Sequence, residues 1–322
     1  MTATATVIVT VTRAAGEPVT QPPTAPAGRT ILVTGAAGLL GRATVAELRR
    51  LGAAVVPVVR RVDPAASADA VAVDLSGDAA ALVAGVDARV DVIVHLAAVV
   101  PRADGSADDE TAAALTRAID GAVARAAQTW DVPVIYASGC ALYARDPGYA
   151  AESAPLAAPR SPYLQAKLDG DIAFASVARN CVLRISSIYG AGMPQDRVLP
   201  RFVAAALARR PITLWGTGSR EQDFVAARDV AHAIGLAAAA RRAGVFNVAA
   251  GRPVTMEALA ALVTAITANP AGYRFAGQPD PQDGAPARYG IEAIARALGW
   301  TPTITLRDGV AEMVAALAER RS

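Results

Sequence analysis

A tyrosine and the single lysine of the chain lie four residues apart, at Tyr163 and Lys167. The preceding Ser161 and Pro162 predict the start of a helix, because serine caps a first turn and proline fits its first position. Residues i and i+4 share one helix face, so the phenol and the ammonium are expected side by side. Because an adjacent ammonium favours phenolate, we predict that the pKa of Tyr163 falls from about 10 toward neutrality. Such a phenol can give a proton to a carbonyl oxygen or take one from an alcohol.

The scarcity of lysine supports a dedicated role for Lys167. The chain has 31 Lys+Arg residues, and all but this one are arginine. An ammonium is compact and sits on a flexible stem, whereas a guanidinium is planar and its charge is spread. A site that needs contact with both a phenol and a ribose therefore favours lysine. The alternative, an exposed tyrosine and lysine on an amphipathic helix, is common for this spacing taken alone.

A glycine-rich turn is the second chemical feature. Gly35, Gly38 and Gly41 follow an apolar strand over residues 31–35 and open a helical pattern over 38–51. The first glycine permits a tight turn, the second lets a diphosphate approach the backbone, and the third lets the helix pack against the strand. The free N–H groups and the positive end of the helix dipole favour the diphosphate. The segment therefore predicts a dinucleotide site.

The residues after the second strand indicate which dinucleotide is bound. An acidic residue usually follows the glycine turn by about 20 positions and holds the ribose 2′-OH of NAD. This chain has Arg60 and Arg61 there, and two guanidiniums suit a 2′-phosphate, so NADP(H) is slightly preferred over NAD(H). The alternative is a solvated arginine pair, with Asp63 still able to reach the ribose. Asp74, at the end of the third strand, is expected near the adenine.

These residues lie on a regular alternation of strands and helices. Further apolar strands, separated by Ala-rich helical stretches, are predicted at 53–59, 71–75, 91–98, 132–138 and 181–187. Alternating strands and helices indicate βαβ units and a parallel sheet. We therefore predict an α/β fold, a Rossmann doubly wound parallel sheet with a smaller C-terminal substrate-binding region. The expected parts are a flexible N-terminal tail (1–28), a dinucleotide-binding Rossmann domain (29–190) and a mainly substrate-binding region (191–322) with segments returning to the sheet.

Composition narrows the classes of function. A net charge of +2 gives no basic excess for phosphate contacts, so no nucleic-acid partner is expected. No apolar run reaches the roughly 18 residues of a membrane helix, so no membrane partner is expected. Cys140 and Cys181 lie in separate apolar runs and indicate the reduced thiols of a cytoplasmic protein. Two histidines and two cysteines without short spacing offer no metal site.

Several of these segments together resemble the extended short-chain dehydrogenase/reductases, the NAD-dependent epimerase/dehydratase family. The resemblance runs from residue 30 to about 320 and rests on TGAAGLLG (34–41), HLAA (95–98), YASGCALYA (136–144), YLQAK (163–167) and LRISSIYGAG (183–192). It implies a Rossmann cofactor domain, a C-terminal substrate domain and hydride transfer at a nicotinamide. It also implies that Tyr163 is the acid/base and Lys167 its tuner. Family members commonly dimerise through a helix pair, so a homodimer with a small-molecule substrate is expected.

The resemblance further implies a set of cofactor contacts at the glycine turn and the strand ends. The expected contacts are Gly35, Ala37, Gly38, Leu39, Leu40, Arg60, Asp74, Leu75, Leu96, Ala97, Ala98, Tyr163 and Lys167. His95, at a strand end near the cofactor, is expected to be structural.

The chain departs from the family pattern at positions that matter for catalysis. The family has a Ser or Thr that hydrogen-bonds the reacting oxygen where this chain has Gly139, and the hydroxyl lies one place earlier, on Ser138. Ser138 is therefore expected as the third catalytic residue through a shifted turn, or that group is missing. The asparagine that supports the lysine through water is replaced by Ala118. The arginine that often binds a nucleotide-sugar diphosphate is replaced by Gln222.

Three functions follow from these observations. The first is an NAD(P)-dependent oxidoreductase or epimerase that transfers hydride at a carbinol or carbonyl carbon of a sugar or sugar nucleotide. Its candidate substrate-anion contacts are Arg201, Arg220 and Arg288. The second is an NADPH-dependent reductase of a non-nucleotide carbonyl in secondary metabolism. The third is a cofactor-binding protein that has lost redox chemistry, which the residues at 139 and 118 suggest.

Overall fold

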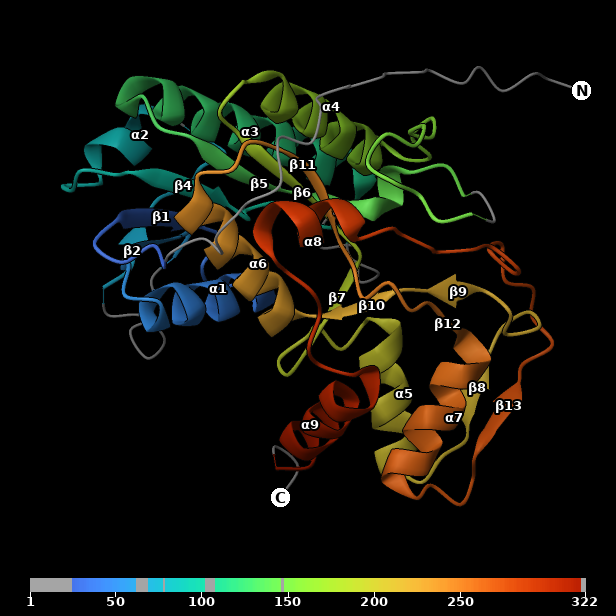
Figure 1. Cartoon of the computed structure of the whole chain (residues 1–322). Coiled ribbons are helices and arrows are strands. Elements are labelled where there is room, and N and C mark those ends of the chain that lie inside the picture. Colours follow the sequence, from blue (N-terminus) through green and yellow to red (C-terminus); the bar gives the residue numbers. More distant parts are fainter. Residues whose placement is uncertain (1–24, 62–68, 78, 102–107, 146–147, 320–322) are drawn as a thin grey trace, which may run out of the picture.

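A seven-stranded parallel sheet forms the centre of the protein (Figure 1). The computed structural model describes residues 25–61, 69–77, 79–101, 108–145 and 148–319, so the expected tail lies outside the described residues except for 25–28. The strand order is β11-β6-β5-β4-β1-β2-β3. The strands are β1 (Thr30–Thr34), β2 (Ala54–Val59), β3 (Val71–Ala72), β4 (Val92–His95), β5 (Val134–Gly139), β6 (Cys181–Ile185) and β11 (Gly244–Val248). The chain order reverses between β1 and β4, which creates a crevice at their carboxyl ends.

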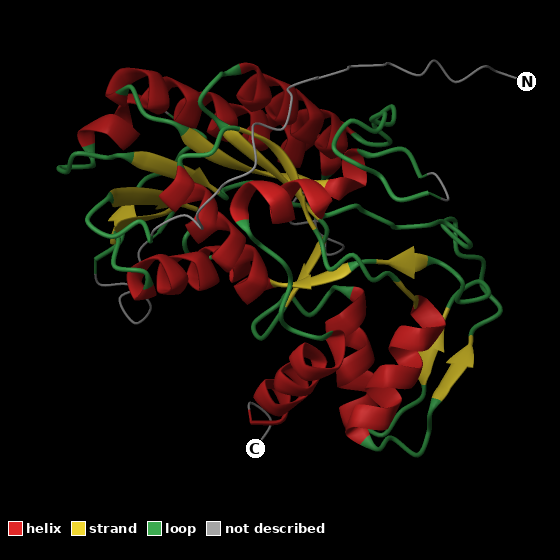
Figure 2. Ribbon diagram, in the orientation of Figure 1, coloured by secondary structure: helices red, strands yellow, loops and turns green. Residues whose placement is uncertain are grey.

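Helices cover both faces of this sheet, as Figure 2 shows. One face carries α1 (Leu39–Arg50), α6 (Ala227–Ala240) and α8 (Glu292–Leu298), and the other carries α2 (Ala79–Ala84), α3 (Asp109–Trp130) and α4 (Pro162–Ser176). The central strands are consequently apolar along their whole length, because a parallel sheet is covered on both sides. In β1 the side chains of Ile31 and Val33 enter one core and that of Leu32 enters the other.

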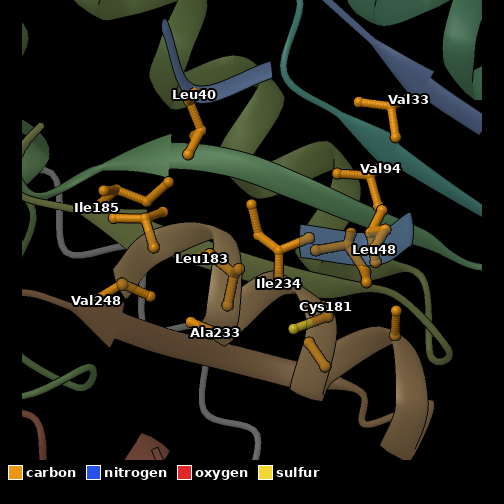
Figure 3. Close-up of a cluster of buried hydrophobic side chains, with 14 of the residues drawn as sticks. Val33, Leu40, Leu48, Val94, Cys181, Leu183, Ile185, Ala233, Ile234 and Val248 are labelled. Atoms are coloured by element: carbon orange, nitrogen blue, oxygen red, sulfur yellow. The ribbon is translucent and has the colours of Figure 1, made fainter. Parts of the chain in front are cut away.

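The core under α1 and α6 holds the glycine turn in place. Figure 3 shows Leu48 of α1 beside Val94 of the sheet, and Leu40 of α1 above Ile185. Ile234 of α6 lies between them in the same core. Full burial of a large aliphatic side chain contributes roughly 1.5–3 kcal/mol to stability. Helix α1, and with it the turn before it, is therefore fixed to the sheet by its own apolar face.

The C-terminal half builds a smaller lobe beside the carboxyl edge of the sheet (Figure 1). Its helices α5 (Val198–Leu207), α7 (Met256–Thr267) and α9 (Leu306–Glu319) share a separate apolar core. Three two-stranded ladders join them: β7 (Ser187–Tyr189) with β10 (Phe224–Ala226), β8 (Ile212–Leu214) with β13 (Tyr273–Phe275), and β9 (Glu221–Gln222) with β12 (Val254–Thr255). Strand β11 leaves this half of the chain and pairs with β6 at the sheet edge.

The predicted fold class is confirmed, and the differences concern strand ends. The strand expected over 71–75 contains only two residues, because Asp74 accepts hydrogen bonds from Ser76 and turns the chain. Pro57 is tolerated within β2 because β3 pairs only with the two residues after it. Among the helices that the structure describes, none combines the length and the apolar composition that crossing a bilayer requires.

We expect Gly41→Ala to destabilise the protein by at least about 2 kcal/mol, because overpacking at a rigid site costs this much. A Cβ at this position would lie 2.1 Å from the Gly35 carbonyl oxygen and 2.7 Å from the Ala36 Cα, both in backbone that the core holds. Urea unfolding followed by circular dichroism measures the change. Gly77→Ala is the matched control, since its nearest neighbour would lie at 3.5 Å, and equal stability of the two variants would contradict the expectation.

Candidate active site

The glycine turn is packed tightly between β4 and α1. Gly35 has a φ of +67°, and a Cβ there would lie 2.8 Å from the Ala97 backbone nitrogen. Gly38 precedes α1 in an extended conformation, and no side chain of the described residues caps the helix. The first turn also lacks acidic residues. The N–H groups at the start of α1 therefore have no side-chain acceptor. These groups and the positive end of the helix dipole face the crevice, and this arrangement fits a dinucleotide diphosphate.

The expected contacts after β4 lie at the same edge. The Thr34 hydroxyl, at the end of β1, accepts hydrogen bonds from the N–H groups of Leu96 and Ala97, each at 3.2 Å. These bonds tie the carboxyl ends of β1 and β4 together beside the turn. Two of the expected contacts, Leu40 and Leu75, have buried side chains within the apolar cores, so they can face a ligand only with their backbones.

The residues expected to select the dinucleotide gather at the ends of β2 and β3. Arg60 and Arg61 follow β2 and are exposed. Hydrogen bonds from Ser76 lower the pKa of Asp74, and the two arginines lower it further, so all three charged groups share one neighbourhood. Asp63, the alternative ribose contact, lies outside the described residues.

Helix α4 begins as predicted and carries Tyr163 and Lys167. Ser161 accepts a hydrogen bond from the Leu164 N–H at 3.3 Å, and Pro162 occupies the first turn. Lys167 is buried beneath the helix rather than turned along its face. Its Nζ donates to the Tyr136 hydroxyl at 2.6 Å and to the Ala137 carbonyl at 2.9 Å, both in the middle of β5.

The predicted effect of Lys167 on Tyr163 is wrong in direction. Burial raises the pKa of Tyr163 to about 12, and Arg197 opposes this shift only in part. The physical reason is that the Lys167 ammonium turns toward β5, where it binds Tyr136 and Ala137. Burial lowers the pKa of Lys167 itself, and the carboxylates of Asp120 and Asp171 oppose that shift.

Ser138 lies in a buried ionic network. Its Oγ donates to Asp171 Oδ2 at 2.6 Å, and Asp171 forms a bidentate pair with Arg184 at 2.7 and 3.0 Å. Arg184 also donates to the Tyr143 hydroxyl at 3.0 Å, which in turn donates to the side chain of Asn247 at 2.7 Å. The Ser138 hydroxyl thus donates its proton to Asp171 of α4. To donate to a substrate instead, the serine would need a different rotamer.

Position 139 has room for the hydroxyl that the family places there. Gly139 is extended, and the nearest atoms to a Cβ built on it lie 3.9 Å away. The described surroundings therefore do not require a glycine at this position. Having glycine here in place of the family's serine or threonine removes a hydroxyl from the site.

A cavity of about 670 Å³ lies in the C-terminal lobe, next to the helix that carries Arg197 at its start. Its wall includes Arg201 and Arg220 together with Trp215, whose side chain is half exposed. Arg220 forms an ion pair with Asp280 at 3.3 Å, and its buried Nε has no partner among the described residues. This lining can take a ligand with both an anionic group and a planar ring.

Arg288, the third residue expected to contact substrate, is not part of the lining of this cavity. Arg288 forms an ion pair with Glu221 at 2.6 Å. Gln222, which replaces the family arginine, hydrogen-bonds the Ser187 hydroxyl. Within the residues that the structure describes, no cluster of His, Cys, Asp and Glu could hold a metal ion.

Sequence reasoning missed the buried polar residues around Lys167. Asp120 and Asp171 are not predicted from the sequence, because acidic residues on helices are normally solvated. Tyr136 is not predicted either, because it lies within an apolar strand. Two signals were available. Asp171 follows Lys167 by four residues, and Asp120 lies between apolar residues of a helix that must pack on the sheet.

Comparison with known proteins shows the family to which the chain is related. Residues 31–249 match the model of the NAD dependent epimerase/dehydratase family. A dTDP-6-deoxy-L-talose 4-dehydrogenase (NAD(P)(+)) of Kitasatospora kifunensis is 30% identical over 318 residues, which cover 91% of this chain and 96% of that protein. A dTDP-glucose 4,6-dehydratase of an Actinoplanes species is 30% identical over 185 residues, covering 55% of this chain and only 57% of that protein.

A solved structure supports the same relationship. The structure of MoeE5 in complex with UDP-glucose and NAD has a TM-score of 0.76 and 27% identity, covering 91% of this chain and all of that chain. The resemblance read from the motifs is thereby confirmed, and so is an NAD(P)-dependent enzyme type at the level of the family.

We expect Ser138→Ala to lower the free energy of unfolding by about 1–2 kcal/mol, because Asp171 loses a buried hydrogen-bond donor. Dinucleotide affinity, measured by quenching of tryptophan fluorescence, should stay within twofold. Ser176→Ala, which removes an exposed hydroxyl on α4, the helix of Asp171, is the control. A variant of full stability that loses turnover would instead assign Ser138 to catalysis.

Proposed function

The chain belongs to the NAD-dependent epimerase/dehydratase family, and from this premise we propose that it is an NAD(P)-dependent oxidoreductase or epimerase of a sugar nucleotide. One observation carries the proposal. The uncapped start of α1 lies at the carboxyl edge of the sheet, and Lys167, one turn after Tyr163 on α4, donates to the Ala137 carbonyl of β5. We infer from this arrangement that the dinucleotide binds beside Tyr163, and we propose the cavity lined by Arg201 and Arg220 as the substrate site.

Tyr163 is proposed as the proton donor and acceptor at the substrate oxygen. A bound nicotinamide supplies or accepts the hydride at the adjacent carbon. With a pKa of about 12 the phenol is protonated at neutral pH and can hydrogen-bond a carbonyl oxygen. Lys167 is proposed to hold the nicotinamide ribose with the ammonium that it extends from α4 to β5. It is also proposed to favour the charged state of the phenol when a proton leaves it. Ser138 is retained as a third catalytic candidate only if it releases Asp171.

The cofactor is proposed to be NAD(P), with NADP(H) preferred. The support is the position of Arg60 and Arg61, two adjacent and exposed arginines beyond β2 that lie near Asp74. MoeE5, in its solved structure, holds NAD, and the Kitasatospora relative is named for both cofactors.

The substrate is proposed to be a nucleoside-diphosphate sugar. The relatives are named for dTDP sugars and MoeE5 holds UDP-glucose. In this chain, Arg201 and Arg220 would bind the diphosphate and Trp215 would stack on the base. Arg288 is withdrawn from this set, because it pairs with Glu221 away from the cavity.

We also propose a homodimer formed through α3 and α4. Along this helix pair runs a groove of about 440 Å³ with a largely apolar lining that includes Ala124, Phe174 and Val177. Val177 is among the exposed large apolar side chains. The buried, unpaired Cys140 and Cys181 support a cytoplasmic location.

A cofactor-binding protein without redox chemistry is the second candidate. Gly139 favours it, because the position that should hold the reacting oxygen carries no hydroxyl although it has room for one. Dinucleotide binding without turnover of any keto sugar, nucleotide sugar or small ketone would establish this alternative.

We expect Tyr163→Phe to lower kcat by at least about 100-fold, because general acid–base catalysis contributes this much or more. Absorbance of the reduced nicotinamide, with nucleotide sugars and keto sugars as substrates, measures the rate. Dinucleotide affinity should be unchanged. Tyr273→Phe, at a half-buried tyrosine of the C-terminal lobe whose hydroxyl donates to Glu257, is the control. Undiminished turnover by the Tyr163 variant would overturn the mechanism.

We expect the double substitution of Arg60 and Arg61 by alanine to weaken NADPH binding about tenfold or more, since a charged hydrogen bond contributes about 1.5–3 kcal/mol. NADH binding should change less than twofold. Fluorescence titration with both cofactors gives the two dissociation constants. Arg49→Ala in the last turn of α1 controls for the general loss of charge. Equal weakening for the two cofactors would argue for solvated arginines.

A further inference from the structure

A continuous chain of hydrogen bonds leads away from Lys167 beneath helices α3 and α4. Lys167 Nζ donates to the Tyr136 hydroxyl at 2.6 Å, and that hydroxyl donates to Asp120 Oδ2 at 2.9 Å. The other carboxylate oxygen, Oδ1, lies 2.9 Å from His95 Nε2, and His95 Nδ1 lies 2.8 Å from the Thr34 hydroxyl. All five residues are buried.

The direction of each bond follows from the partners available. The Thr34 hydroxyl oxygen already accepts from two backbone N–H groups, so its own proton goes to His95 Nδ1. His95 then carries its proton on Nε2 and donates to Asp120. Because Tyr136 also donates to Asp120, both bonds end on one carboxylate. This carboxylate is the anion at the end of the chain that starts at the Lys167 ammonium.

The second nearby carboxylate is committed elsewhere. Asp171, one turn after Lys167 on α4, forms the bidentate pair with Arg184 and accepts from Ser138. Among the described residues, Asp120 forms no direct ion pair with an arginine or a lysine. The charged and titratable groups that surround Lys167 are therefore Asp120 on α3, Asp171 on α4, Tyr136 on β5, His95 on β4, Arg184 on β6 and Tyr163 on α4.

We propose that Asp120 and Tyr136 are positioning residues that hold the Lys167 ammonium against β5, in place of the asparagine that Ala118 replaces. The aspartate lies two residues after Ala118 on α3 and reaches the lysine through one phenol. The inference depends on the proposed function of Lys167 at the dinucleotide, but the arrangement of the three side chains can be tested without any turnover.

The test uses the fact that Lys167 is the only lysine in the chain. Protein labelled with ¹³Cε-lysine gives a single side-chain resonance, and its chemical shift reports the protonation of Lys167 as pH is raised. We expect Asp120→Asn, which keeps the shape and removes the charge, to move the titration midpoint downward by about one pH unit or more, because a buried ammonium loses its anion. Tyr136→Phe should move it in the same direction, because it removes an acceptor of the ammonium.

The matched control is Asp169→Asn, on the outer face of α4, the helix that carries Lys167. Asp169 is exposed and pairs with Arg117 at 3.0 Å, so solvent should screen its effect on the midpoint to about 0.2 pH units or less. Thermal unfolding of each variant verifies that it is folded. Midpoints of the Asp120 and Tyr136 variants that match the unmodified protein would overturn the proposal.

Activity then separates this proposal from the proposed function. If turnover is found, the alkaline limb of the kcat profile of Asp120→Asn should move to lower pH together with the resonance, with KM for the sugar nucleotide within twofold. A moved resonance without turnover in any form of the protein would keep Asp120 as a positioning residue and remove the oxidoreductase assignment. An unmoved resonance in an active enzyme would keep the oxidoreductase assignment and remove Asp120 as a positioning residue.

Discussion

Two cations are buried between the sheet and the α3–α4 pair. The need to pair each of these positive charges with a carboxylate constrains the packing around them. Lys167 is 8% exposed and Arg184 is 2% exposed. A buried charge that loses its partner costs several kcal/mol, so each cation must meet an acceptor wherever the backbone puts it. Lys167 reaches Asp120 of α3 through Tyr136, and Arg184 binds Asp171 of α4 directly. The two helices are thereby held at fixed positions over β5 and β6.

The polar contacts and the close helix packing depend on one another. A Cβ at Gly170 would lie 2.3 Å from the Tyr136 hydroxyl and 2.4 Å from the Asp120 carboxylate. Only a glycine therefore lets α4 come near enough for Lys167 to reach β5. The same approach places the first turn of α4, with Tyr163, beside the carboxyl edge of the sheet. The ionic network and the position of the phenol are consequences of a single backbone approach.

Much of the fold was predictable because its signals are local. The strand periodicity, the glycines of the turn and the capped start of α4 each act over a few residues, and the structure confirms all three. The direction of the Lys167 side chain was not predictable in this way. Spacing assigns a residue to a helix face, but the acceptor it finds depends on β5, which lies about thirty residues earlier. The burial of Ser138 has the same origin, since its partner Asp171 comes from another element.

The surroundings of Tyr163 bear on the direction in which the site works best. Burial raises the pKa of the phenol to about 12, so the protonated form dominates at neutral pH. A protonated phenol can hydrogen-bond a carbonyl oxygen and give up its proton as hydride reaches the carbon, whereas oxidation of an alcohol first needs a base. Gly139 leaves no second hydroxyl to orient that alcohol, and Ser138 is engaged with Asp171. On the proposed mechanism a carbonyl needs less support than an alcohol, because the proton donor itself orients it, so we propose that these side chains favour reduction over oxidation.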